Sequence, residues 1–210
     1  MKKMIIKVCG MREQENIRDV ETLDVDFLGF IFYSKSSRYV DAKSLEAIRK
    51  CTKPKVGVFV NEVFGDILDK AKLYNLDYLQ LHGNETSDLC GELQQRGYSI
   101  IKAFSIASAD DFKSVGDYSD CCDYFLFDTK CAGYGGSGQR FDWSLIDEYK
   151  GSVPFLLSGG LNSDCCEDLI RLNHDKFAGI DLNSGFEASP AMKDVGRLRD
   201  FIESIRKHYV

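Results

Sequence analysis

The sequence has no surplus of basic residues and no long apolar segment. Its 27 lysines and arginines are outnumbered by 33 aspartates and glutamates, which gives a formal net charge of -6. Proteins that bind nucleic acid or an anionic membrane surface usually carry a basic patch, so we expect neither kind of partner. No apolar run approaches the ~18 residues that a membrane-spanning helix needs. The expected protein is therefore globular.

Motifs for metal binding, disulfide formation and secretion are also missing. None of the eight cysteines forms a C-x-x-C pair, and four of them stand as two adjacent pairs, at 121–122 and 165–166. This pattern is a poor disulfide framework and a poor zinc site, so we expect free thiols in a reducing cytoplasm and no metal. The start, Met1-Lys2-Lys3, leads into few apolar residues, whereas a secretory signal has a longer apolar region.

Short apolar runs rich in β-forming residues recur along the chain at a nearly even interval. They begin near Met4, Phe27, Lys55, Tyr78, Ile100, Tyr124, Val153 and Phe177. Helical patterning lies between them, for example over residues 41–50 and 63–73. Ser108 and Asp111 have the spacing of a capping box. Ser189-Pro190 predicts the start of a last helix around residues 194–205.

Eight strands that alternate with helices predict an α/β fold with a parallel sheet. The eight units, each about 26 residues long (210 divided by eight), favour a single (βα)8 TIM barrel over residues 1–210. An open flavodoxin-like sheet is the alternative, but it would have fewer strands. No linker or charge block divides the chain. The glycine-rich stretch 129–140 follows the sixth strand and is a candidate for a mobile active-site loop.

Polar residues interrupt the predicted strands on one face. In the first strand Lys7 and Cys9 share a face, and Gln80 and His82 do so in the fourth. The sixth strand ends in Asp128. The working face of such barrels is the C-terminal end of the strands, so we assign function to Cys9 and Asp128.

The eighth strand adds Asp181 to this polar face. For Lys7, Gln80 and Asp181, packing inside the barrel and direct contact with a substrate are equally compatible with the sequence. We therefore treat Lys7, His82 and Asp181 as supporting residues. The sequence alone leaves open which partners His82 and Asp181 find.

Glycine-rich turns follow the last two strands. Gly159-Gly160 follows the seventh strand, and Ser184-Gly185 follows the eighth. Backbone amides at such turns attract anions, and barrels of this kind often hold a phosphate there. These two loops predict a phosphate site. After the second strand, the planar fork of Arg38 suits a carboxylate, whereas Lys35 is expected in a solvated loop.

These residues together resemble the phosphoribosylanthranilate isomerase family of tryptophan biosynthesis. The resemblance follows the family's order over nearly the whole chain. The matching stretches are residues 7–10, 29–33, 36–39, 56–61, 79–83, 128–130, 134–138, 141–143, 157–161 and 181–187. Two positions depart from the family pattern. Ser34 stands where proline is common, and Asn183 stands where serine is common, so Asn183 is expected to alter the phosphate contacts in detail.

The resemblance implies an Amadori rearrangement in a (βα)8 barrel without a metal or organic cofactor. Cys9 resembles the general base and Asp128 the general acid. Arg38 resembles the residue that binds the anthranilate carboxylate, and the loops at Gly159-Gly160 and Ser184-Gly185 resemble the phosphate cradle. A carboxyl pKa raised by burial suits an acid. A thiol pKa lowered by a cation suits a base, and Lys7 is the candidate cation.

Three other functions are alternatives for such a barrel. A ribulose-phosphate epimerase needs a set of metal ligands at the strand ends, where His82 is the only histidine. An indole-glycerol-phosphate synthase would have a longer N-terminal extension. A non-catalytic sugar-phosphate-binding barrel would have no use for an acid–base pair. The expected partner is the small-molecule substrate phosphoribosylanthranilate, and the oligomer is a monomer or a homodimer.

Overall fold

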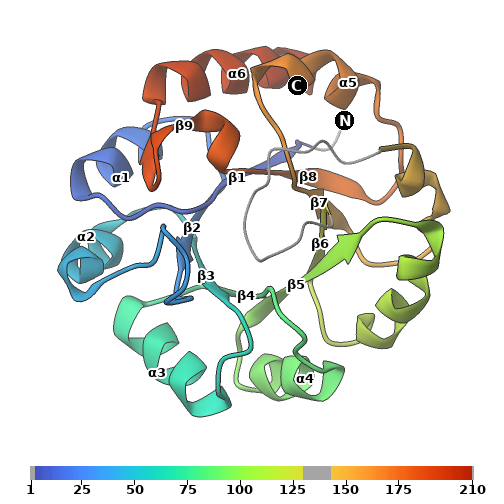
Figure 1. Cartoon of the computed structure of the whole chain (residues 1–210), viewed down its shortest axis with the longest axis horizontal. Helices are drawn as coiled ribbons and strands as arrows, with labels where there is room; N and C mark the ends of the chain where they lie inside the picture. The colour runs from blue at the N-terminus through green and yellow to red at the C-terminus, as the bar shows by residue number, and fades with distance from the viewer. Residues whose placement is uncertain (1–2, 130–142, 210) are drawn as a thin grey trace.

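A computed structural model describes residues 3–129 and 143–209. Eight parallel strands form a closed barrel in which each strand pairs with the next along the chain (Figure 1). The strands are β1 (Ile5–Val8), β2 (Phe27–Ile31), β3 (Lys55–Phe59), β4 (Tyr78–Leu81), β5 (Ser99–Ile106), β6 (Tyr124–Thr129), β7 (Phe155–Leu157) and β8 (Phe177–Leu182). The predicted (βα)8 barrel is confirmed, and each strand begins within two residues of its predicted start.

The first and last strands close the barrel. β1 pairs in parallel with β8, and Lys7 stands opposite Asp181 in that register. β1 also pairs with β2 on its other side, where Lys7 stands opposite Phe27. The polar face of β1 therefore lies beside the polar residue of β8.

Alternation along the strands separates two apolar cores. The larger core includes Ile6 and Val8 and packs the outer face of the sheet against the helices. The smaller core fills the part of the barrel interior that lies nearer the start of the strands. Its buried members are Phe27, Val56, Ile101, Ala103 and Leu126. On β6, Tyr124 packs against this inner core, and Asp128, four residues later, is on the same face. Interior side chains thus change from apolar to polar toward the C-terminal strand ends.

The outer layer combines α-helices with 3₁₀ segments. The α-helices are α1 (Gln14–Glu21), α2 (Leu45–Lys50), α3 (Phe64–Tyr74), α4 (Ser87–Gln95), α5 (Cys166–Arg171) and α6 (Val195–His208). The segments that follow β5 and β6 are 3₁₀ helices, η2 (Ala109–Tyr118) and η3 (Trp143–Glu148). The predicted capping box of Ser108 and Asp111 is present at the start of η2. Short 3₁₀ segments also precede α2 and α5, as η1 (Ala42–Ser44) and η4 (Ser163–Cys165).

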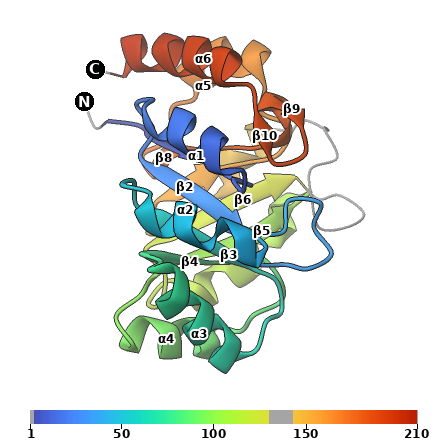
Figure 2. The same ribbon diagram turned by 90° about the vertical axis from the view of Figure 1, so that its left-hand side faces the viewer.

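The last unit contains an extra hairpin that the sequence did not predict. After η5 (Ser184–Phe186), β9 (Glu187–Ser189) pairs antiparallel with β10 (Met192–Lys193). The last helix is confirmed close to its predicted place, but Ser189-Pro190 does not begin it, because Pro190 occupies the turn of this hairpin and Asp194 caps α6. β10 lies beside α1 (Figure 2), where Asn16 and the backbone of Lys193 exchange two hydrogen bonds.

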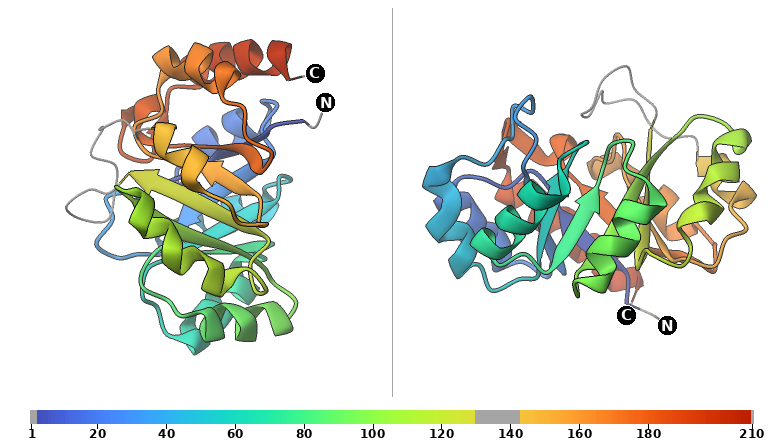
Figure 3. Two further views of the ribbon diagram at one scale, coloured as in Figure 1. Left: turned by 90° about the vertical axis from the view of Figure 1, so that its right-hand side faces the viewer. Right: turned by 90° about the horizontal axis from the view of Figure 1, so that it is seen from below.

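The two ends of the barrel differ in what they carry. β1 begins and α6 ends at the same end, where the strands start (Figure 3). The opposite end carries the loops that follow the strands. The predicted glycine-rich loop 129–140 lies outside the described residues apart from Thr129. Within residues 3–129 and 143–209, no helix has both the length and the apolar character needed to cross a membrane.

The closure of the barrel predicts the effect of one substitution in β8. A Cβ added at Gly179 would lie 2.1 Å from the carbonyl oxygen of Ile5, so β1 and β8 would have to separate. We expect Gly179→Ala to lower the free energy of unfolding by about 1–3 kcal/mol or more, as overpacking does. Urea denaturation measures this change.

Gly65→Ala is the matched control, because Gly65 is exposed on α3 and an added Cβ would meet nothing within 4 Å. It should stabilise the protein by up to about 1 kcal/mol through helix propensity. Equal stabilities of the two variants would contradict this account of barrel closure.

Candidate active site

A cavity opens at the C-terminal ends of the strands and collects most of the predicted site residues. Its lining residues come from every part of the barrel except β5: Cys9, Ile31, Tyr33, Ser36, Val58, Val60, Gln80, His82, Asp128, Ser158, Gly159, Gly160, Leu161, Asp181, Asn183 and Ser184. Three predicted residues, Lys7, Arg38 and Gly185, are not among these lining residues. The fold therefore brings Cys9, Asp128 and both glycine-rich loops to one space.

A buried ion pair lies at the base of this cavity. Lys7 Nζ is 2.7 Å from Asp181 Oδ2, and the two side chains are 0% and 5% exposed. The pKa of Asp181 is raised, because burial outweighs the opposing effect of the neighbouring Lys7 ammonium. Asp181 Oδ1 has no hydrogen-bond partner within the described part of the chain. Asp181 lines the cavity, although this oxygen is itself buried.

Cys9 is positioned by the two strands that flank β1. Its backbone N–H donates over 2.8 Å to the carbonyl of Leu182, the last residue of β8. On the other side, a Cβ at Gly29 would lie only 2.8 Å from Cys9 Sγ, so the glycine of β2 makes room for the thiol.

Two opposing effects act on the Cys9 thiol. Burial raises its pKa, and the ammonium groups of Lys7 and Lys193 oppose this rise without cancelling it. The expectation that Lys7 lowers the thiol pKa therefore identifies a real interaction, but burial outweighs it. At neutral pH the resting residue is a thiol rather than a thiolate.

Asp128 faces two polar side chains at the end of β4, those of His82 and Gln80. His82 Nε2 lies 3.5 Å from Asp128 Oδ2. Gln80 Nε2 lies 2.8 Å from His82 Nδ1. An amide N–H only donates, so in this orientation of Gln80 the Nδ1 atom accepts and Nε2 carries the proton toward Asp128. The Asp128 side chain is 24% exposed, so this carboxyl is only partly buried.

The loops after β7 and β8 interlock. Gly159 and Gly160 have positive φ angles of 89° and 68°, which L-residues with a side chain seldom adopt. A Cβ at Gly185 would lie 2.0 Å from the carbonyl oxygen of Leu161. Gly185 thus lets the β8 loop contact the β7 loop, while Ser184 lines the cavity. The two loops form a continuous wall of backbone that suits an anion.

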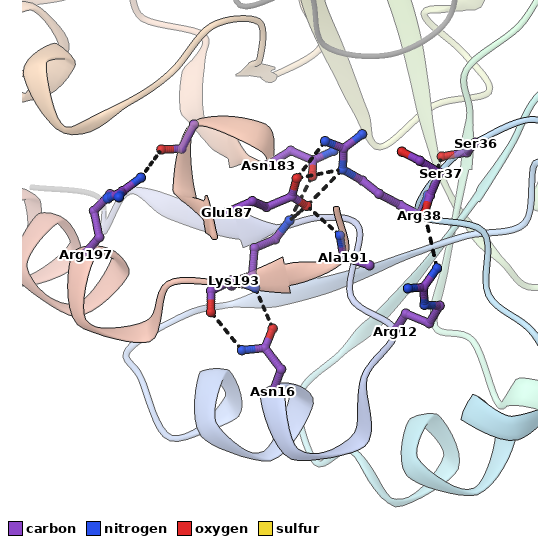
Figure 4. A network of polar contacts seen from close by, with 11 residues as sticks. Arg12, Asn16, Ser36, Ser37, Arg38, Asn183, Glu187, Ala191, Lys193 and Arg197 are labelled. Carbon is purple, nitrogen blue, oxygen red and sulfur yellow. Dashed lines mark hydrogen bonds and ion pairs between the residues drawn. The ribbon is translucent and has the colours of Figure 1, made fainter. Parts of the chain in front are cut away.

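Arg38 belongs to a cluster of charged residues at the rim (Figure 4). Its Nη2 atom lies 2.6 Å from Glu187 Oε2, and its Nε lies 2.9 Å from Glu187 Oε1. Lys193 Nζ donates to Glu187 Oε1 over 2.6 Å and to Asn183 Oδ1 over 2.9 Å. Asn183, one of the two departures from the family pattern, is therefore held by Lys193.

The two cations of this cluster hold Glu187 in its ionised form. Burial acts to raise the pKa of Glu187, but hydrogen bonds from Arg38 and Lys193 lower it overall. Burial lowers the pKa of Lys193. One carboxylate and two cations leave a net positive charge beside Cys9, since an added Cβ at Gly10 would meet Arg38, Asn183 and Lys193. The cluster thus favours a negatively charged group nearby.

Sequence reasoning did not assign roles to Glu187 and Lys193. Glu187 lies inside the matching stretch 181–187, so its place in that stretch was the available signal. Lys193 follows an unpredicted hairpin, and an isolated lysine gives no sign that its side chain is fully buried, as it is here. Lys35 is exposed, as predicted for a solvated loop.

The Lys7–Asp181 pair predicts a strong coupling in stability. Asp181→Asn would leave a buried ammonium without its counter-charge, so we expect a loss of about 3–5 kcal/mol in the free energy of unfolding. The double variant Lys7→Met with Asp181→Asn should recover much of this loss. A double-mutant cycle by urea denaturation measures the coupling.

Glu167→Gln serves as the control, because its ion pair with Arg171 is largely exposed. This substitution should leave the urea midpoint unchanged. Additive effects of the Lys7 and Asp181 substitutions would contradict the coupling.

A known protein family matches nearly the whole of the chain. The family described as N-(5'-phosphoribosyl)anthranilate (PRA) isomerase matches residues 6–204. The N-(5'-phosphoribosyl)anthranilate isomerase of Parabacteroides distasonis is 53% identical over 206 residues, covering 96% of this chain and 93% of the relative.

Solved structures agree with the sequence comparison. Phosphoribosyl anthranilate isomerase from Thermotoga maritima is 34% identical with a TM-score of 0.83, covering 97% of this chain and 99% of that one. A second structure, phosphoribosyl anthranilate isomerase in complex with reduced 1-(o-carboxyphenylamino)-1-deoxyribulose 5-phosphate, is 31% identical with a TM-score of 0.80, covering 97% and 99%. The chain therefore belongs to the N-(5'-phosphoribosyl)anthranilate isomerase family.

Proposed function

We propose that this chain is an isomerase of tryptophan biosynthesis that converts N-(5'-phosphoribosyl)anthranilate to 1-(2-carboxyphenylamino)-1-deoxyribulose 5-phosphate in the cytoplasm. The observation that carries this proposal is that Cys9, Asp128 and the loops after β7 and β8 all line one cavity. Residues 1–210 act as one catalytic domain. Each barrel contains the whole set of site residues, so the active form is a monomer or a homodimer.

The two ends of the substrate fit two different anion sites. The backbone wall at Gly159, Gly160 and Ser184 takes the phosphate, because it presents glycine backbone and a hydroxyl to the cavity. Gly185 supports this wall from behind. At the other end, the guanidinium of Arg38 binds the anthranilate carboxylate. Glu187 holds Arg38 by its Nε and Nη2 atoms, which leaves Nη1 for a ligand.

The reaction begins with ring opening. Asp128 donates its proton to the ring oxygen as the C1–O bond breaks, and the nitrogen lone pair forms a C1=N double bond. His82 positions the Asp128 carboxyl by its Nε2 atom. Asp181 and Gln80 line the cavity and bind the substrate hydroxyls through their polar side chains.

A proton then leaves C2. Cys9, whose thiol proton has first passed to solvent, takes it as a thiolate, and the C–H electrons form a C1=C2 bond while the C=N electrons return to nitrogen. The resulting enolamine becomes the ketone by proton transfer. The substrate nitrogen accepts the electrons, so this chemistry requires no metal or organic cofactor. Because burial raises the pKa of Cys9, the cations of Lys7 and Lys193 act by stabilising the thiolate once it forms.

The acid–base assignment predicts a loss of turnover without a loss of binding. Cys9→Ala and Asp128→Asn should each lower kcat by about 10²–10⁴-fold or more, since each removes a proton-transfer group. KM should stay within a few fold because neither variant changes an anion site. Steady-state kinetics on the fluorescent anthranilate adduct gives both constants.

The matched control is Cys51→Ala, which alters a buried thiol outside the cavity. This variant should keep wild-type turnover. Near-normal turnover in Cys9→Ala or Asp128→Asn would overturn the assignment, and so would a wild-type chain that fails to rescue a tryptophan auxotroph lacking this step.

The rim cluster predicts a different kinetic signature. Arg38→Ala removes the charged hydrogen bonds to the carboxylate, which are worth about 1.5–3 kcal/mol, so KM should rise by roughly 10–100-fold. Glu187→Gln should raise KM by a smaller factor, because Arg38 then keeps its charge but loses its anchor. Lys35→Ala, in an exposed part of the same loop, should leave KM unchanged. Equal KM values for Arg38→Ala and Lys35→Ala would contradict the carboxylate site.

A further inference from the structure

Three cysteine thiols converge in the outer layer of the barrel. Cys90 lies on α4, while Cys121 and Cys122 lie in the turn between η2 and β6. Their three Sγ atoms all lie within 4.8 Å of one another. α4 and η2 are neighbours outside the barrel wall (Figure 1), so two separate elements build this cluster.

The cluster is distinct from the active site. None of the three cysteines is among the residues that line the cavity at the strand ends. The reaction proposed above uses a thiol on β1 and assigns nothing to this cluster. A separate role therefore has to come from the chemistry of the three thiols themselves.

The positions of the three sulfur atoms suit one metal ion. Zinc–sulfur bonds of about 2.3 Å place tetrahedral ligand sulfurs roughly 3.8 Å apart, so small side-chain movements bring these atoms to coordinating distance. The surrounding backbone is fixed on both sides. Cys90 is within α4, and Cys121 N–H donates to the carbonyl of Tyr118 over 3.2 Å. The Tyr118 hydroxyl in turn donates to the carbonyl of Glu85, which precedes α4, over 2.9 Å.

All three cysteines of the cluster are buried. Cys90 is 0% exposed, whereas Cys121 and Cys122 are each 8% exposed, so these two are the members nearest to solvent. A set of three sulfur ligands selects soft ions and disfavours magnesium or calcium, which prefer oxygen.

We propose that Cys90, Cys121 and Cys122 form a binding site for one soft thiophilic metal ion of the zinc class. Each thiol loses its proton to solvent as its sulfur binds, so one ion releases three protons and no electron transfer is involved. The bound ion joins α4 to the turn before β6, which are more than 25 residues apart in the sequence. The site adds stability to this side of the barrel and leaves the catalytic cavity unchanged.

Metal titration of the full-length, reduced protein tests the proposal. After treatment with a chelator, the wild type should take up one equivalent of Zn²⁺ in competition with a chromophoric chelator. Cd²⁺ should give a sulfur-to-metal charge-transfer band that saturates at one equivalent. Cys90→Ala and Cys122→Ala should each lose the band and at least tenfold in Zn²⁺ affinity.

The chain offers a matched control in its other adjacent cysteine pair. Cys165→Ala with Cys166→Ala removes two thiols from η4 and α5, and this variant should keep full metal uptake. Zn²⁺ should also raise the thermal midpoint of the wild type and of this control, but not that of Cys90→Ala. Circular dichroism before titration shows whether each variant is folded.

Four outcomes would overturn the proposal. The first is the absence of stoichiometric uptake by the reduced wild type, and the second is equal uptake by Cys90→Ala. The third is uptake that disappears only in the Cys165/Cys166 control. The fourth is a disulfide between two of the three thiols in air with no ion bound after reduction, which would make the cluster a redox pair.

Discussion

The ion pair between Lys7 and Asp181 is the constraint on which the rest of the site depends. It joins β1 to β8 across the seam of the barrel, and both partners are nearly or fully removed from solvent. A buried charge is tolerated only with a partner, so each strand fixes the register of the other. Cys9 follows Lys7 by two residues and Asn183 follows Asp181 by two, so this register also sets the positions of the thiol and of the β8 loop.

The side chains inside the barrel change from apolar to polar along the strands. Aromatic and aliphatic side chains fill the lower part of the barrel, and polar side chains occupy the same strand faces nearer the mouth. The apolar layer excludes water from below, which strengthens electrostatic interactions among the groups above it. The same exclusion of water explains why the pKa of the Cys9 thiol is raised despite two nearby ammonium groups. Cys9 is therefore held as a neutral thiol.

Much of the fold was predictable because a strand has a strict period of two. The alternation in residues 4–10 and 124–128 predicts which side chains enter the barrel, and the even spacing predicts eight strands. The rim cluster was not predictable, because Glu187 and Lys193 meet Arg38 through a hairpin whose proline turn imitates a helix start. The partial exposure of Asp128 was not predictable either, since the position of a residue in a strand does not determine how far a loop covers the strand end. Long-range contacts of this kind are absent from local patterns.

The seam between β1 and β8 also bears on how the chain is made. Lys7 and Asp181 are 174 positions apart, so their pair forms only after the chain as far as β8 has left the ribosome. Until then β1 has an unpaired edge and its lysine lacks a counter-charge. Such an edge invites pairing with other chains during synthesis. The eighth unit therefore completes both the barrel and the cavity at its mouth.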